Sequence, residues 1–455
     1  MLTRIDVRGR QEAELAALLP RPAEAGSDVR AAVAAILDRV RRDGDAALRA
    51  LTSELDGVDV VQARVSGREV EAALRRVPGD LRAALELAHR NITAYHTHEA
   101  PAPGDYVDDG LRVRHLVRPV DRAGCYAPGG RARYPSSVLM CATPARVAGV
   151  GEVVLCVPPG RDGRVDDATL AAAAVAGVDE VYAVGGAQAI AAMAYGTQSI
   201  RPVDVIVGPG NRYVAEAKRQ VSGAVGVAAA FAGPSEVVVV AGPETPADYA
   251  AVDLAVQAEH GPDGLAWLVT WTPGKGEEVE AALARIVQAS PRRADLESTL
   301  GSHGYTCLVD DVAQALAVAN VVAPEHLELL LDDAEAQLER VRAAGAVFCG
   351  PLSPASLGDY VAGPNHVLPT DRTARFASAL RADDFRRHIH AVSVDARALG
   401  ALAPHVVVLA TTEGLPAHAD SVRIRTAGSP IPGGPASGVP GPGGTGPGVG
   451  DGSPR

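Results

Sequence analysis

The stretch EVVLCVPPGRDGRVDDATLAAAAVAGVDEVYAVGGAQAIAAMA, residues 152–194, decides the fold class of this 455-residue chain. Two short apolar runs, 153–157 and 181–184, alternate in it with two alanine-rich segments, 168–176 and 187–194. Continuous apolar strands followed by helices are typical of a parallel sheet that helices cover on both faces. The stretch therefore predicts an α/β fold.

The same alternation continues on both sides of this stretch. An apolar run at 203–207 precedes a Gly-Pro-Gly turn and a predicted helix at 212–220. Apolar periodicity upstream predicts helices over 27–42 and about 78–98. Further strand-like runs lie at 237–240, 265–270, 306–309 and 346–348. We expect two Rossmann-like parallel-sheet α/β domains, one inserted in the other.

The changes of pattern also predict the domain boundaries. The expected parts are an N-terminal helical arm (1–25), a discontinuous first α/β domain (26–123 and 236–380), a second α/β domain (124–235) and a C-terminal extension (381–427). Residues 428–455 are rich in Gly, Pro and Ser and have no hydrophobic periodicity. Such a segment cannot bury enough apolar surface to offset chain entropy, which predicts a disordered tail.

The composition argues against several classes of protein. The chain has 47% hydrophobic and 22% charged residues, with a formal net charge of −12. Acidic and basic residues are interspersed, whereas nucleic-acid binders gather Lys and Arg on one face. No apolar run approaches the roughly 20 residues that span a bilayer, and the charged N-terminus lacks the apolar core of a signal peptide. We expect a cytoplasmic protein with neither a nucleic-acid nor a membrane partner.

The five cysteines are scattered along the chain: Cys125, Cys141, Cys156, Cys307 and Cys349. Their number is odd, most have apolar neighbours, and none forms a CxxC pair. This pattern favours buried free thiols in a reducing compartment over disulfides. It also argues against a cysteine zinc site.

A first candidate site lies where a predicted helix ends before Gly261 and Pro262. Gln257 and His260 are three residues apart and therefore share one face of the last turn. The partially negative end of a helix suits a cation. Spacing alone nevertheless favours a solvated polar helix end, because a Gln ligand is uncommon and the HExxH pair is absent.

A second candidate is the adjacent pair Glu325 and His326, which follows Pro324 and precedes an apolar run. The pattern predicts a helix start beside a cleft. Histidine titrates near about 6.5 and can exchange protons at neutral pH, and a neighbouring carboxylate can be a second base. Taken alone, the pair fits a surface Glu-His pair better.

Other polar residues lie in predicted loops. Asp359 and His366 lie in the glycine- and proline-rich stretch 351–369, where an Asp could be an oxygen ligand for zinc, although an Asp in a turn is more frequent. Glu413 and His418 lie near the end of the predicted ordered chain.

Two glycine-rich turns complete the set. Gly208-Pro209-Gly210 and the following Asn211 come between a strand and a helix, where backbone N–H groups could bind phosphate. The motif is neither GxGxxG nor a P-loop and is weak evidence for a dinucleotide. Ser235 lies in a turn into a strand, where a serine has many possible uses.

Taken together and in order, eight sequence blocks resemble the histidinol dehydrogenase family. They are YAPGGRARYPSSVLM, GGAQAIAAMAYGT, VDVIVGPGNRYVAEAKR, AGPSEVVVV, QAEHGPDG, APEHLEL, GDYVAGPNHVLPT and EGLPAH. The similarity covers about 124–425 and extends upstream to 91–96, and only the tail has no counterpart.

The resemblance implies the members of the site. Zinc would be held by Gln257, His260, Asp359 and His418. Histidinol would be held by Ser235, His326, His366 and Glu413 alongside the zinc ligands. Tyr126, Gln188 and Asn211 match the NAD contacts of the family, and Glu325 and His326 match its proton acceptors. The family also implies an intertwined homodimer in which Glu413 and His418 complete the partner's site.

The implied reaction oxidises L-histidinol through L-histidinaldehyde to L-histidine with two NAD, the last steps of histidine biosynthesis. His326 takes the hydroxyl proton, Glu325 activates water for the aldehyde, and zinc mainly orients the substrate.

Two alternative functions are compatible with parts of this pattern. A related zinc- and NAD-dependent dehydrogenase could act on another amino alcohol, although Glu413 and the paired imidazole and amine ligation argue against it. A non-catalytic binding protein of this fold would show damage to Glu325 and His326 or to the zinc set, and both are intact.

Overall fold

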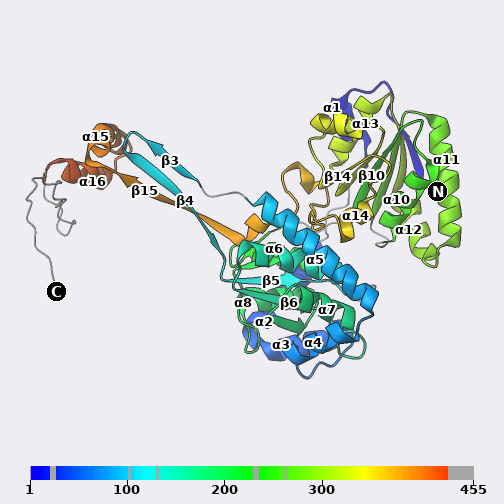
Figure 1. Ribbon diagram of the computed structural model, residues 1–455, viewed down its shortest axis with the longest axis horizontal. Coiled ribbons are helices and arrows are strands. Elements are labelled where there is room, and N and C mark those ends of the chain that lie inside the picture. Colours follow the sequence, from blue (N-terminus) through cyan, green and yellow to red (C-terminus); the bar gives the residue numbers. More distant parts are fainter. Residues whose placement is uncertain are drawn as a thin grey trace, which may run out of the picture. The chain divides into compact units, whose positions relative to one another are not determined.

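The computed structural model describes residues 2–20, 27–100, 104–129, 133–228, 235–259, 261 and 264–428. The chain forms two compact units, Met1–Ala102 with Val117–His388, and Pro103–Leu116 with Ile389–Arg455. The first unit contains two six-stranded sheets, and each is covered by helices on both faces (Figure 1). The predicted α/β class with two parallel sheets is confirmed.

The first sheet has the order β1-β12-β11-β10-β13-β14, and all of its neighbouring strands are parallel. Its strands are β1 (Thr3–Asp6), β10 (Glu236–Ala241), β11 (Leu265–Thr270), β12 (Gly304–Leu308), β13 (His326–Leu330) and β14 (Ala346–Cys349). One face packs on α10 (Ala247–Ala258), α11 (Pro273–Ala289) and α12 (Arg293–His303). The other face packs on α1 (Glu12–Leu18) and α13 (Val312–Val322).

The second sheet has the order β2-β7-β6-β5-β8-β9, and only the β2–β7 pair is antiparallel. Its strands are β2 (Arg64–Val65), β5 (Arg122–Tyr126), β6 (Glu152–Val157), β7 (Glu180–Ala183), β8 (Val205–Val207) and β9 (Gly226–Val227). One face packs on α4 (Gly67–Arg76), α5 (Gly79–Glu99), α6 (Pro135–Ala148) and α7 (Asp167–Val175). The other packs on α2 (Ser27–Asp43), α3 (Asp45–Leu51), α8 (Gly186–Tyr195) and α9 (Arg212–Val221).

Both sheets contain the strand order 3-2-1-4-5 when their strands are counted from β10 and from β5. In this order the direction of winding reverses between the first and fourth strands, and ligands of such folds bind at the carboxyl ends there. In the first sheet this point is bridged by Thr245. Its hydroxyl donates to Leu330 O at 2.6 Å and accepts from Gly242 N at 2.9 Å, and a Cβ on Gly242 would meet Leu331 at 3.0 Å.

The chain is divided between the sheets differently from the prediction. Residues 26–123 were expected with the first sheet, but α2 and α3 pack on the second through Val33 and Leu48, and α4 and α5 do so through Ala73 and Ile92. The predicted helical arm 1–25 begins with β1, an edge strand of the first sheet. Apolar periodicity shows that a helix packs on something, but it carries no information on which sheet.

The second unit contains the sheet β15-β4-β3 and two helices. Its elements are β3 (Asp105–Asp108), β4 (Leu111–Pro119), β15 (Arg386–Val394), α15 (Ala396–Thr412) and α16 (Pro416–Thr426); the two long strands β4 and β15 continue into the first unit. The C-terminal extension predicted at 381–427 therefore also includes the β3–β4 hairpin. The short helices are η1 (Thr52–Asp56), η2 (Ala334–Arg340), α14 (Ala355–Tyr360), η3 (Thr373–Arg375) and η4 (Ala382–Phe385). The predicted disordered tail, from residue 429 onward, lies outside the described residues.

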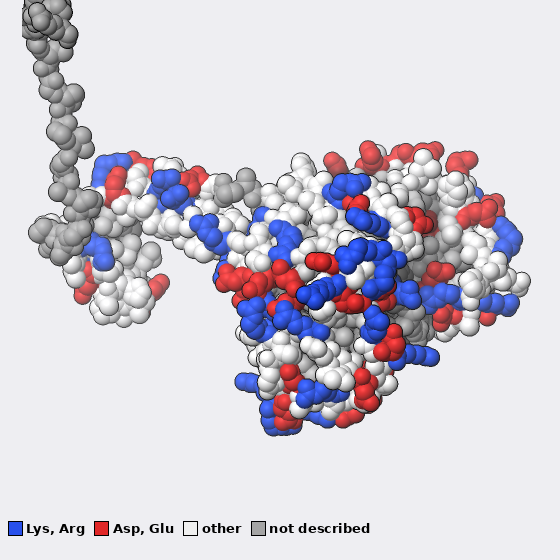
Figure 2. All heavy atoms as spheres, turned by 60° about the horizontal axis from the view of Figure 1, so that its bottom comes forward, with Lys and Arg blue, Asp and Glu red and all other residues white. Residues whose placement is uncertain are grey.

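Other expectations from composition can be compared with the fold. All five cysteines are free thiols, four of them buried and Cys349 half-buried, as predicted. Acidic and basic side chains are interspersed on the face drawn in Figure 2. None of the helices in the described parts of the chain is long and apolar enough to cross a membrane.

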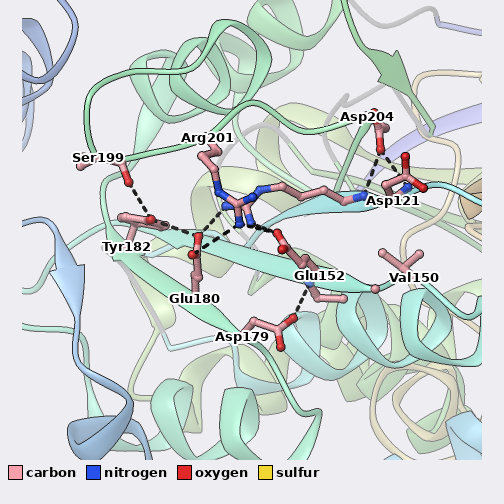
Figure 3. Close-up of polar contacts among 12 residues, drawn as sticks. Asp121, Val150, Glu152, Asp179, Glu180, Tyr182, Ser199, Arg201 and Asp204 are labelled. Carbon is pink, nitrogen blue, oxygen red and sulfur yellow. Dashed lines mark hydrogen bonds and ion pairs between the residues drawn. The ribbon is translucent and has the colours of Figure 1, made fainter.

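A buried guanidinium joins three strands of the second sheet at their amino ends. Arg122, the first residue of β5, is 6% exposed and forms ion pairs with Glu152 of β6 and with Glu180 of β7. Arg201 also pairs with Glu152, at 2.5 Å, and Tyr182 donates a hydrogen bond to Glu180 (Figure 3). The amino edge is thereby fixed, and the carboxyl edge carries the glycine-rich turns.

Replacing Arg122 with methionine should destabilise this unit by about 3 kcal/mol, because two carboxylates would lose their shared cation. Hydrogen bonding to Arg122 lowers the pKa of Glu152. Burial alone would raise the pKa of Glu180, but the hydrogen bond and charge of Arg122 outweigh burial, and the pKa of Glu180 is lowered. Carboxylates with a lowered pKa stabilise above their unfolded pKa of about 4.3, and this contribution is lost as pH falls through the folded pKa.

Chemical denaturation at pH 7 and at low pH measures both effects. The difference between wild type and Arg122→Met should be large at pH 7 and shrink below about pH 4. Arg201→Met is the matched control, since its side chain is 63% exposed and should contribute no more than about 1 kcal/mol. Equal losses of unfolding free energy in Arg122→Met and Arg201→Met would contradict the stabilising role assigned to Arg122.

Candidate active site

A serine and a carboxylate meet at the amino ends of β10 and β13. Ser235 immediately precedes β10, and its hydroxyl donates to Glu325 Oε2, while Glu325 immediately precedes β13. The same oxygen accepts from Glu236 N at 3.1 Å. These two donors fix the orientation of the Glu325 carboxylate.

The imidazole of His326 lies between two carboxylates. His326 begins β13 and is 4% exposed; its Nδ1 lies 3.8 Å from Glu325 Oε2 and its Nε2 lies 3.4 Å from Asp359 Oδ1. Neither ring nitrogen completes a hydrogen bond with the described residues. Burial alone would lower the pKa of His326, but the charges of Glu325 and Asp359 outweigh it and raise the pKa above the ordinary value.

The local structure at His326 corrects the prediction of a helix start. The residues form a strand in which Leu327 and Leu329 enter the core on one face, whereas His326 and Glu328 lie on the other. This is the period-2 alternation of a β-strand. The apolar residues here fit either a helix or a strand, because periodicity alone does not separate these two structures in a short run.

Asp359 and His366 lie beside this imidazole. Asp359 was predicted in a loop, but it lies in the last turn of the six-residue helix α14. His366 Nδ1 donates to the Asp359 carbonyl oxygen at 2.7 Å, and Ser137 Oγ lies 3.3 Å from His366 Nε2. Burial lowers the pKa of His366, so at neutral pH its ring is uncharged.

A cavity of about 700 Å³ opens beside these groups. His326, Asp359 and His366 contribute to its wall, together with Phe348, Glu99 and Arg381. A cavity of this size suits a small-molecule ligand. The structure thus brings Ser235, Glu325, His326, Asp359 and His366 into one region.

The remaining predicted zinc ligands are distributed differently. Gln257 lies in the last turn of α10, 3% exposed, with its buried Nε2 lacking a hydrogen-bond partner within the described structure. His260 lies outside the described residues. Glu413 directly follows α15 and His418 lies in α16, both exposed in the second unit. Over the described ranges, no group of three or more His, Cys, Asp or Glu side chains is arranged to hold a metal ion.

The three predicted NAD residues lie at the carboxyl edge of the second sheet. Tyr126 ends β5, and its hydroxyl accepts from Gly186 N at 3.1 Å. Gln188 donates to Asp56 at 3.4 Å, while its buried Oε1 has no partner in the described part of the chain. Asn211 caps α9 by accepting from two backbone N–H groups, at 3.0 and 3.2 Å. Tyr126 and Asn211 flank the strand reversal between β5 and β8, where nucleotides bind in such sheets, while Gln188 lies in α8 directly after β7.

The Gly208 turn beside these residues requires glycine. Gly208 has φ +111°, and a Cβ there would lie 2.0 Å from the carbonyl oxygen of Tyr126. The close approach of β8 to β5 therefore depends on the missing side chain.

Four buried polar groups were missed from the sequence. Glu236, Glu328 and Asp253 are each less than 8% exposed near the site, and His96 is fully buried. His96 Nδ1 lies 2.5 Å from Glu99, and its Nε2 lies 3.4 Å from the amide nitrogen of Asn365. A charged residue inside an apolar strand or helix was the available signal for the three acids.

The fold and the site define an α/β enzyme that holds acid–base groups at the amino ends of two strands in one of its two sheets. A model of the family described as histidinol dehydrogenase matches residues 19–426. The chain belongs to the histidinol dehydrogenase family, and it is an oxidoreductase of histidine biosynthesis.

Individual relatives agree with this assignment. The histidinol dehydrogenase of Synechococcus sp. is 47% identical over 398 residues, which cover 87% of this chain and 92% of that protein. The histidinol dehydrogenase of Aromatoleum aromaticum is 47% identical over 408 residues, 88% of this chain and 93% of that one. The crystal structure of histidinol dehydrogenase from Elizabethkingia anophelis is similar with a TM-score of 0.89 at 31% identity, covering 94% of this chain and 98% of that one.

Proposed function

We propose that this chain oxidises L-histidinol through L-histidinaldehyde to L-histidine and that two NAD molecules accept the two hydrides. The observation that carries the proposal is the buried imidazole of His326 between the carboxylates of Glu325 and Asp359, at the wall of the cavity. Alcohol oxidation needs a base that takes the hydroxyl proton as hydride leaves the adjacent carbon, and a histidine in this setting can be that base.

The two acceptors have different tasks in this proposal. His326 takes the hydroxyl proton of histidinol while hydride passes from the carbinol carbon to the first NAD. Glu325, held by Ser235 and by Glu236 N, then accepts a proton from the water that adds to the aldehyde. The resulting hydrate loses hydride to the second NAD and becomes the carboxylate of histidine. Water supplies the added oxygen atom.

The proposed zinc ligands are Gln257, His260, Asp359 and His418. Two members of this set lie in the first unit among the described residues: Gln257 is 3% exposed and its amide Nε2 has no hydrogen-bond partner there, and Asp359 offers a carboxylate beside His326. Amide and carboxylate oxygens and imidazole nitrogens are donors that suit Zn²⁺. Bound zinc would orient the substrate, which Ser235, His326, His366 and Glu413 would also contact.

We assign the NAD contacts to Tyr126, Gln188 and Asn211. The position of Tyr126 and Asn211 at the reversal of strand order supports this assignment, and Gln188 Oε1, which has no partner among the described residues, offers a hydrogen bond to a ligand. We further place the enzyme in the cytoplasm, as the free thiols favour.

A second copy of the chain is the proposed partner. Leu402, Val406 and Leu409 of α15 recur at helical spacing on one face and are 44%, 38% and 64% exposed. An exposed apolar face of this kind marks an interaction surface. In the proposed homodimer, Glu413 at the end of α15 and His418 complete the partner's site.

Product formation from purified protein tests the proposed reaction. L-histidinol with excess NAD should yield two NADH and one L-histidine per histidinol consumed. A panel of other amino alcohols should be oxidised far more slowly. Faster turnover of another amino alcohol would instead assign the chain to a related dehydrogenase, and absence of NADH formation from every compound would favour a binding protein.

Removal of metal should abolish NADH formation, because the substrate would lose the group that orients it. Chelator-treated protein is assayed before and after addition of zinc, with metal content measured by elemental analysis. Addition of zinc should restore the rate of NADH formation. Removal of the chelator by dialysis, with no zinc added, should not restore it. Full activity in protein shown to be metal-free would contradict the zinc assignment.

A further inference from the structure

A second acid lies on the same strand face as His326. Glu328 is two residues further along β13 and 1% exposed. Its Oε1 accepts a hydrogen bond from Ala355 N, the first residue of α14, at 2.9 Å. Its other oxygen, Oε2, is buried and has no partner among the described groups when the carboxyl is ionised. Glu328 Oε2 must therefore either carry a proton or accept a hydrogen bond from a donor.

Asp253 supplies the missing partner. It lies on α10, one turn before Gln257 and therefore on the same helix face, and it is 7% exposed. The carboxyl groups of Glu328 and Asp253 contact each other, and burial together with this neighbour raises the pKa of Glu328 to about 9. Two ionised carboxylates in contact would repel, so one proton is shared, and Glu328 O–H donates to Asp253.

The pair connects the three elements that carry the site. β13 carries His326, α10 carries Gln257, and α14 carries Asp359. Asp359 lies four residues, about 6 Å of helix, beyond the backbone N–H that Glu328 holds. Because α14 has six residues and begins at Ala355, the anchor at its first turn sets where its last turn lies.

We propose that the hydrogen-bonded carboxyl pair Glu328–Asp253 is a positioning device that holds Asp359 and Gln257 in place around His326. Neither acid touches the substrate; they act through the residues they brace. Outer hydrogen bonds of this kind typically change metal affinity or activity ~10–100-fold. The inference rests on the proposed zinc site and adds two residues to it.

Two substitutions of Glu328 separate positioning from mere packing. Glu328→Gln keeps a carbonyl oxygen for Ala355 N and offers an N–H to Asp253, so the brace survives. Glu328→Met fills a similar volume but makes neither hydrogen bond. Leu330→Met, two residues further along the same strand face, is the control, because it changes a 3% exposed side chain without touching the pair.

The readout is the affinity of metal-free full-length protein for zinc alone, measured by competition with a chromophoric chelator. Circular dichroism checks folding, and kcat and KM for histidinol are measured beside it. Glu328→Met should bind zinc ~10–100-fold more weakly and lose kcat, whereas Glu328→Gln and Leu330→Met should stay within about threefold of wild type.

The outcomes distinguish this inference from the proposed function. Wild-type protein that does not bind zinc would overturn the proposed zinc site. If wild type binds zinc and a folded Glu328→Met variant binds it with equal affinity, the positioning role of the Glu328–Asp253 pair is contradicted. The same holds if Glu328→Gln binds zinc as weakly as Glu328→Met. If Glu328→Met fails to fold, Asp253→Leu tests the pair from α10, with the same loss expected and wild-type affinity as the contradicting result.

Discussion

His326→Asn should slow the oxidation of both histidinol and histidinaldehyde by ~10²–10⁴-fold, the usual contribution of a general base. The imidazole is the group at the cavity wall that lies between two carboxylates, and asparagine keeps a polar side chain but cannot accept the hydroxyl proton. Both steps should suffer, since hydride leaves an oxygen-bearing carbon in each. Steady-state assays with either substrate measure the loss.

A matched control comes from a histidine outside the site. His98→Asn changes an exposed residue near the end of α5 and should leave both rates unchanged. Thermal denaturation shows whether each variant is folded. A folded His326→Asn enzyme that oxidises either substrate at the wild-type rate would remove His326 from the chemistry.

Glu325→Gln should slow oxidation of the aldehyde much more than the first hydride transfer, again by ~10²-fold or more. The amide keeps the shape of the carboxylate and can still contact Ser235 and Glu236 N, but it cannot accept a proton from water. The first step relies on His326 as the base, so it should be less affected.

Stopped-flow measurement of NADH formation separates the two steps. The variant should release the first NADH quickly and the second slowly, and rapid quench should detect accumulated histidinaldehyde. Equal slowing of both transfers would show that Glu325 and His326 act as a unit, and the division of labour proposed for them would be wrong.

The fold class could be predicted because its signal is local. Runs such as 153–157 and 203–207 fill strands β6 and β8, and the helix predicted at 27–42 is α2. The assignment of 26–123 to the first sheet failed because the choice between two similar sheets is made by long-range packing. Val33 and Ile92 look the same in sequence whichever sheet they cover.

Five of the residues that the resemblance assigned to the site lie near one another in the first unit, whereas Glu413 and His418 lie in the second unit and His260 lies outside the described residues. Ser235, Glu325, His326, Asp359 and His366 do meet, as the resemblance implied, but their spacing in sequence gave no distances between them. A helix start is expected at Glu325–His326 because the leucines that follow, Leu327, Leu329 and Leu330, fit either a helix or a strand. Glu328 and Asp253 were overlooked because a charged residue in sequence is most often solvated, and their contact joins a strand and a helix 75 residues apart.

The Thr245 bridge has a consequence for the timing of the reaction. It joins the carboxyl ends of β10 and β13 at the strand reversal of the first sheet, whereas the proposed NAD residues Tyr126 and Asn211 lie at the corresponding reversal of the second sheet. With NAD proposed at the second sheet alone, the two hydride transfers of the proposed reaction would use the same nucleotide site in turn. Spent NADH has to depart and a fresh NAD has to enter while the aldehyde waits on the protein. An enzyme with one nucleotide site must therefore retain the reactive aldehyde while NADH is exchanged for NAD in each cycle. This retention matters more than the rate of either hydride transfer.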